Sequence, residues 1–133
     1  MGLDMYLYKI PKVDRVDDST NKIDYDLVSD KSEIAYWRKF NALHNWLVDN
    51  AQGGEDECNP HIVNPELIQK SIDLLKSLSP ENCNDLFPTS SGFFFGSTEY
   101  NELYWNDVTE TIDVLEKLSF DPDTEDLVYL SSW

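Results

Sequence analysis

Four carboxylates near the C-terminal end recur at the spacing of one helix face: Glu99, Glu102, Glu110 and Asp113. In a helix predicted over residues 99–118 they lie within about 80° of one another and span about 21 Å. Neighbouring charges are then roughly 5–11 Å apart, a scale comparable to phosphate spacing on a nucleic-acid strand. The row is either the solvated face of an amphipathic helix or a nucleic-acid-mimicking surface that occupies a basic groove of a partner.

The charge of the second half of the chain bears on this choice. Residues 77–133 contain twelve acidic side chains and one basic side chain, Lys117, so they carry −11 of the formal net charge of −16. Such a surface repels nucleic acid and anionic membranes and attracts basic protein surfaces. We therefore expect a protein partner with a basic groove, and no direct binding to nucleic acid or to a membrane.

A second set of side chains could line a pocket for an anionic nucleotide. Arginine binds phosphate, histidine and asparagine form hydrogen bonds, and aromatic rings stack on a base. The candidate residues are Trp37, Arg38, Asn41, His44, Ser91, Gly92, Phe93 and Trp133. In the competing interpretation, His44 is hydrogen-bonded within the core and Arg38 pairs with one of the many acids.

Other chemistry has weaker sequence support. Asp56, Cys58 and His61 include a C-x-x-H spacing, but no second ligand pair accompanies it, so we expect no metal site. We assign no catalytic residue and expect no cofactor. Cys58 and Cys83 are far apart in sequence, and we expect free thiols. The N-terminal sequence lacks the pattern of a signal peptide, and no apolar run approaches the roughly 18 residues of a membrane span.

These residues must be positioned by a small set of elements within a single domain, residues 1–133. Alternation predicts strands over residues 3–10 and 127–133, with Leu127, Tyr129 and Trp133 facing one side, and an aromatic strand over 91–97. Helical periodicity and capping signals predict helices over 31–51, 65–78 and 99–118, and a short extended piece is predicted at 25–28. The predicted fold class is α+β, with three helices packed on a small antiparallel sheet.

Four segments together carry a resemblance. They are MGLDMYLY at the start, AYWRKFNALHNW, LFPTSSGFFFGSTEY and the closing YLSSW. In order and spacing they resemble a family of small phage and prophage proteins of unassigned function, over essentially the whole chain. Ser90 departs from the pattern, because that family more often has Gln at this place.

The resemblance implies a phage-borne accessory protein that acts in a bacterial cytoplasm, a setting typical of counter-defence factors. The leading hypothesis is a non-enzymatic inhibitor of a bacterial defence system, similar to an anti-CRISPR protein, that binds through its acidic surface. One alternative is a binding protein that sequesters an anionic nucleotide signal of host immunity. A second alternative is a small enzyme that acts on such a ligand, with His44 as its acid or base.

Overall fold

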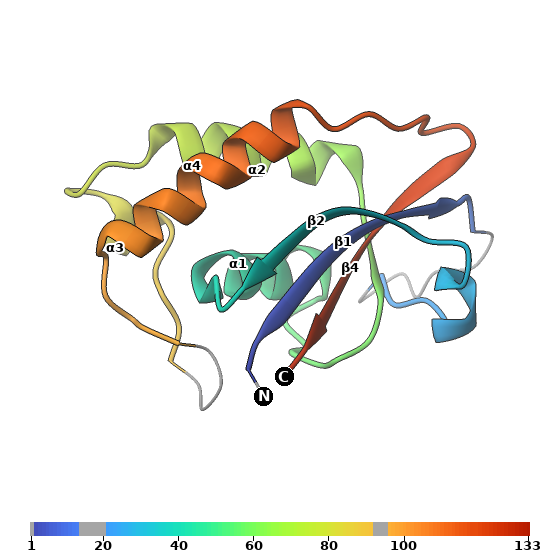
Figure 1. Ribbon diagram of the computed structural model, residues 1–133, viewed down its shortest axis with the longest axis horizontal. Coiled ribbons are helices and arrows are strands. Elements are labelled where there is room, and N and C mark those ends of the chain that lie inside the picture. The colour runs from blue at the N-terminus through green and yellow to red at the C-terminus, as the bar shows by residue number, and fades with distance from the viewer. Residues whose placement is uncertain (1, 14–20, 92–95) are drawn as a thin grey trace.

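The chain forms a four-stranded antiparallel sheet with helices packed against it (Figure 1). The computed structural model describes residues 2–13, 21–91 and 96–133. The strands are β1 (Asp4–Pro11), β2 (Ser32–Arg38), β3 (His61–Val63) and β4 (Glu125–Ser132). Their order is β2-β1-β4-β3. The two termini are side by side, because Asp4 pairs with Ser132 across the central strands.

Within the described residues the helices are α1 (Asn41–Ala51), α2 (Pro65–Ser77), the short α3 (Cys83–Leu86) and α4 (Glu102–Glu116). Helices α2 and α4 pack against each other, and α4 also contacts β2. Together with the antiparallel sheet, these helices confirm the predicted α+β class. Over the described ranges, no helix combines the length and the apolar character needed to cross a bilayer.

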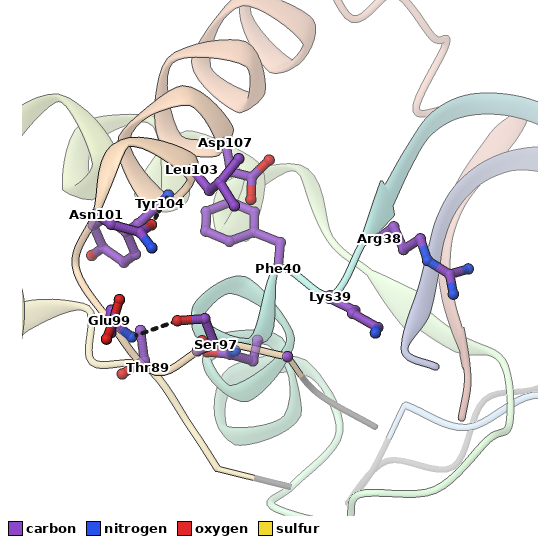
Figure 2. Close-up of a pocket in the computed structure, with 12 residues that line it drawn as sticks. Arg38, Lys39, Phe40, Thr89, Ser97, Glu99, Asn101, Leu103, Tyr104 and Asp107 are labelled. Atoms are coloured by element: carbon purple, nitrogen blue, oxygen red, sulfur yellow. Dashed lines mark hydrogen bonds between the residues drawn. The ribbon is translucent and has the colours of Figure 1, made fainter. Parts of the chain in front are cut away.

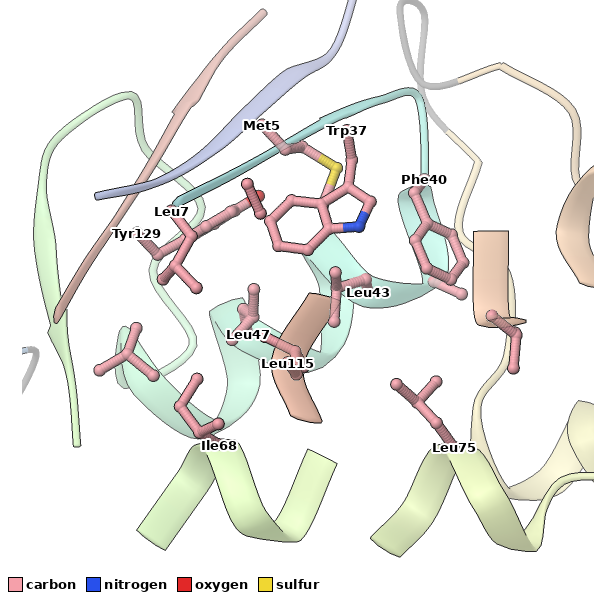
Figure 3. Close-up of a cluster of buried hydrophobic side chains, with 14 of the residues drawn as sticks. Met5, Leu7, Trp37, Phe40, Leu43, Leu47, Ile68, Leu75, Leu115 and Tyr129 are labelled. Carbon is pink, nitrogen blue, oxygen red and sulfur yellow. The ribbon is translucent and has the colours of Figure 1, made fainter. Parts of the chain in front are cut away.

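The main core lies between one face of the sheet and the helices (Figure 3). The alternating residues Met5 and Leu7 of β1, with Trp37 of β2 and Tyr129 of β4, point into this layer. The opposite face carries a smaller cluster that includes Tyr8, Ile10, Val128 and Leu130 of the sheet, with Ile23 and Val28 from the segment around the 3-10 helix η1 (Tyr25–Val28). This arrangement buries alternate residues of each central strand on opposite faces.

The helix predicted over residues 31–51 was wrong in its first half. Residues 32–38 form strand β2, in which Ala35 and Trp37 are buried while Tyr36 and Arg38 are exposed. Helix α1 begins only at Asn41, after Lys39 adopts a left-handed backbone conformation with φ of 58°. That conformation is incompatible with a continuous right-handed helix, so the capping signal at Asp30 does not start one.

The other predicted boundaries have mixed outcomes. Strand β1 and helix α2 are confirmed, and the Asn64 side chain accepts a hydrogen bond from the Leu67 N–H at 2.9 Å as an N-cap. Residues 25–28 form a 3-10 turn and not an extended piece, and β3 and α3 were not predicted. Of the predicted strand over 91–97, positions 92–95 lie outside the described residues, while Ser91, Gly96 and Ser97 are not in a strand.

The C-terminal third follows the prediction with shorter bounds. Asn101 caps α4, so the helix begins at Glu102 and Glu99 precedes it. Strand β4 buries Leu127, Tyr129 and Ser131 as expected, but it ends at Ser132. Trp133 follows the strand and is 45% exposed, so the predicted strand over 127–133 ends one residue earlier and its last side chain is only partly buried.

Candidate functional site

A cleft of about 300 Å³ separates the turn between β2 and α1 from the N-terminal end of α4 (Figure 2). Its described lining residues are Arg38, Lys39, Phe40, Asn41, Thr89, Gly96, Ser97, Glu99, Asn101, Leu103, Tyr104 and Asp107. The cleft therefore combines aromatic rings, amides, hydroxyls and charges of both signs. Its volume is at the lower end of the range of about 300–1,000 Å³ found for ligand sites.

The floor of the cleft is set by the left-handed turn at Lys39. The Lys39 N–H donates a hydrogen bond to the Leu3 carbonyl at 2.7 Å, which attaches this turn to the start of β1. The aliphatic part of the Lys39 side chain passes close to Gly2 and Gly96, where an added Cβ would come within 2.9 Å and 3.0 Å of its carbons. The next residue, Phe40, is buried beneath the cleft, with its ring packed edge-on against Tyr104.

Asn41 binds the segments around Ser90 and Ser97, which lie next to the β2–α1 turn. Its amide nitrogen donates to the Ser97 carbonyl at 2.8 Å, and its amide oxygen accepts the Ser90 N–H at 3.0 Å. The Asn41 side chain is almost fully buried. Because both groups of the amide are used, this candidate ligand residue also has a structural role in holding positions 90 and 97 against α1.

The opposite wall is the first part of α4. The Asn101 side chain accepts the Tyr104 N–H at 3.3 Å, and the Tyr104 hydroxyl donates to the Phe87 carbonyl at 2.8 Å. Burial raises the pKa of Tyr104 well above its ordinary value, so this hydroxyl stays protonated and continues to donate. With Tyr104 facing the core, the preceding residue Leu103 is turned to the surface, where it is 68% exposed.

The four predicted carboxylates, which we call the acidic face, are all exposed. Asp113 pairs with Lys117 at 3.0 Å. Within the described part of the chain, Glu99, Glu102 and Glu110 form no salt bridge. Because Glu99 precedes α4, the helical part of the row runs from Glu102 to Asp113, about 17 Å at 1.5 Å per residue. Three of the four carboxylates of the acidic face, beside the cleft and along α4, are therefore not neutralised by a described basic side chain.

Asp107 adds a half-buried carboxyl group to this region. Figure 2 shows Asp107 and Leu103 on α4 above the ring of Phe40. Burial, and to a smaller extent the charge of Glu110, raises the pKa of Asp107 from 3.8 to about 6. A carboxylate in this position is mostly ionised at neutral pH but is held there at a cost in free energy.

Two of the proposed nucleotide-binding residues are engaged in the fold. Trp37 is buried, and its indole N–H donates to the Thr111 hydroxyl at 2.8 Å, which joins β2 to α4. Arg38 is exposed on the sheet face away from the core and pairs with Asp4 at 3.0 Å. Asp4 also accepts the Tyr36 hydroxyl at 2.5 Å. Of these two residues, Arg38 is the one that lines the cleft.

His44 lies in the core, as the competing interpretation proposed. Its Nδ1 is 2.6 Å from the Tyr129 hydroxyl and its Nε2 is 2.8 Å from Asp56. Burial lowers the pKa of His44, although the charge of Asp56 opposes this effect. A neutral His44 that donates from Nε2 to Asp56 can accept the Tyr129 O–H at Nδ1, so these contacts join α1, β4 and the loop after α1.

The remaining candidates do not gather at the cleft. Ser91 is exposed and Trp133 follows β4, and neither is among the described residues that line the cleft. Gly92 and Phe93 lie outside the described residues. Of the eight proposed nucleotide-binding residues, the structure thus brings Arg38 and Asn41 to one cleft, together with Glu99 of the acidic face.

Sequence reasoning missed Leu103 and Asp107. The signal for Leu103 was present, because Leu103 precedes Glu110 by seven residues and so shares its helix face, where an apolar side chain is unexpected. Asp107 gave no such signal, since its partial burial depends on the β2–α1 turn across the cleft.

In the described residues both cysteines are free, and no group of three or more His, Cys, Asp or Glu side chains is arranged to hold a metal ion. Comparison with protein-family models, with curated proteins and with solved structures finds no match.

Proposed function

We propose that this protein is a phage-encoded inhibitor of a bacterial defence system, similar to an anti-CRISPR protein, that binds a basic groove of its target. The observation that carries the proposal is the negative charge of Glu99, Glu102 and Glu110, which form no salt bridge with any described residue, on the same side of the molecule as the exposed side chain of Leu103. An apolar anchor ringed by charged residues is typical of protein interfaces. The resemblance to small phage and prophage proteins supplies the setting, a bacterial cytoplasm.

The charge distribution favours a protein target over a nucleotide. Glu99 and Asp107 line the cleft beside Arg38, so an anionic ligand would meet repulsion as well as attraction. Trp37 and His44, which would have to stack on the base or act as acid or base, are buried and hydrogen-bonded in the core. The nucleotide-sequestering and enzymatic alternatives therefore have less support than an inhibitor that binds its target through the acidic face.

The proposal is tested by DNA cleavage with purified CRISPR nucleases loaded with guide RNA. The wild-type protein should inhibit cleavage of a matched DNA target at 50 mM salt, and inhibition should weaken as salt rises because exposed charges are screened. The triple variant Glu99→Gln, Glu102→Gln, Glu110→Gln should lose inhibition at least tenfold. Asp113 is left unchanged because of its ion pair with Lys117.

The matched control removes the same charge elsewhere. Asp24, Asp26 and Asp30 are exposed in or beside η1, at the far end of the molecule from the start of α4 (Figure 1). The variant Asp24→Asn, Asp26→Asn, Asp30→Asn should inhibit like the wild type. If the two triple variants lose inhibition equally, net charge and not the acidic face is responsible. If neither loses it at low salt, the acidic face is not the binding surface.

A further inference from the structure

The positive groups of the cleft are held away from its acidic wall. Arg38 is bound to Asp4 at 3.0 Å. The stem of Lys39 is confined between Gly2 and Gly96, and Figure 2 shows both basic side chains directed away from α4. The carboxylates on the α4 side, Glu99 and Asp107, form no salt bridge with any described residue. The α4 end of the cleft therefore presents negative charge without a counter-ion.

Apolar groups lie next to this negative charge. Leu103 is 68% exposed at the edge of the cleft, whereas Phe40 and Tyr104, which also line it, are almost fully buried. A ligand that fits must carry a cation at one end and an apolar stem behind it. A carboxylate binds a guanidinium through two parallel hydrogen bonds.

We propose that this cleft receives an arginine side chain of the protein target, with its guanidinium on Asp107 and its stem against the exposed Leu103. This inference rests on the proposed function and identifies the group by which the target is recognised. Arginine suits the site better than lysine, because its planar guanidinium is weakly hydrated and pairs with a carboxylate through two hydrogen bonds. Glu99 and Glu110 add to the field that attracts it.

The test is an NMR titration of the wild-type protein with the peptide acetyl-Gly-Arg-Gly-amide, followed through the backbone amide signals. The control ligand replaces arginine with citrulline, which has the same shape but no charge. The arginine peptide should shift the signals of residues 101–107 in a saturable way, and the citrulline peptide should bind at least fivefold more weakly. Equal affinity for the two peptides, or shifts spread without saturation over all acidic surfaces, would overturn the proposal.

Two variants locate the binding group. The variant Asp107→Asn should bind the arginine peptide at least fivefold more weakly than the wild type. The control variant Asp26→Asn removes one exposed charge far from the cleft and should bind the peptide like the wild type. Unchanged affinity in Asp107→Asn contradicts the pairing with Asp107. The result is separable from the proposed function: if the peptide does not bind but the Glu99, Glu102, Glu110 variant still loses nuclease inhibition, the inhibitor proposal stands and the arginine site is rejected.

Discussion

At the scale of single residues, the Asp107 carboxylate opposes folding at neutral pH. Its carboxyl group is half-buried near Glu110, and its pKa in the folded protein, about 6, is above the ordinary value of 3.8. The folded state therefore binds its proton more tightly than the unfolded chain does. Stability from this group is complete below about pH 4 and is lost as pH rises through 6. A carboxylate kept at such a cost fits a role in binding a cation.

Replacing Asp107 with Asn should therefore stabilise the protein at neutral pH. The full shift would correspond to roughly 3 kcal/mol, and solvent screening of a partly exposed group reduces the expected gain to about 1–2 kcal/mol at pH 7. At pH 4, where Asp107 is protonated in the folded protein, the gain should nearly vanish. Urea unfolding at the two pH values measures this, and equal stabilisation at both would show that Asp107 carries no unfavourable charge.

His44 gives the opposite dependence on pH. Its pKa is lowered in the folded state, so its contribution to stability is present above the unfolded value of 6.5 and is lost as pH falls. Charging the imidazole would also break its role as acceptor for the Tyr129 hydroxyl. Lowering the pH therefore destabilises the core through protonation of His44.

The variant His44→Gln should cost about 1–3 kcal/mol at pH 7.5, because Tyr129 and Asp56 lose a well-placed partner. It should also flatten the decline of melting temperature between pH 7 and pH 5.5. Nuclease inhibition at a temperature well below melting should stay unchanged, since His44 is buried away from the acidic face. Loss of inhibition in a folded variant would instead assign His44 to the site.

At the scale of elements, β4 depends on its last residues. Ser131 is buried and pairs with Met5, and Ser132 pairs with Asp4 at the end of the central strand β1. Trp133 lies beyond the strand and is 45% exposed. The sheet should therefore tolerate loss of the indole better than loss of the two serines.

Deleting residues 131–133 should lower stability by about 2–3 kcal/mol, at about 1 kcal/mol for each lost backbone hydrogen bond. Deleting Trp133 alone should cost less than deleting all three residues, because it removes no residue of the β1–β4 pairing. Thermal melts of the two truncated proteins give the comparison. A shorter chain that melts like the wild type would show that Ser131 and Ser132 are not needed for β1–β4 pairing.

The β2–α1 region shows what sequence patterns could and could not provide. Residues 34–38 also carry a strand signal, with Ala35 and Trp37 alternating against Tyr36 and Arg38, but the continuous apolar spacing into α1 favoured a helix. The left-handed turn at Lys39 is stabilised by contacts with Leu3 and Gly96, which are distant in sequence. Helix α2, in contrast, was predictable because its cap, its proline and its apolar face are local.

The candidate site follows the same division. The exposed carboxylates of α4 follow from helical spacing alone, whereas the cleft requires Asn41 to hold positions 90 and 97 and requires Phe40 to meet Tyr104. The helix predicted over residues 31–51 would have placed Trp37, Arg38 and His44 together on one element. The structure separates them, since the side chain of a strand residue points to the opposite face from that of its neighbour.

At the scale of the whole molecule, the formal charge of −16 is unevenly neutralised. Lys9, Lys12, Lys76 and Lys117 pair with acids of β4 and of the C-terminal half of α4, while Lys22 pairs with Glu57 and Arg38 with Asp4. The N-terminal half of α4 has no such pairing among the described residues. On the proposed function, the unpaired acids of α4 orient the protein toward a basic partner surface, and this effect is greatest at low ionic strength.

The most direct test of this orientation is the plating efficiency of a phage on bacteria that carry a CRISPR system with a matching spacer. Cells that express the wild-type protein should permit plating at least about a hundredfold above cells without it. The Asp24, Asp26, Asp30 variant should do the same, and the Glu99, Glu102, Glu110 variant should restore immunity. Full protection of the phage by the Glu99, Glu102, Glu110 variant, at equal protein levels, would contradict binding through the acidic face of α4.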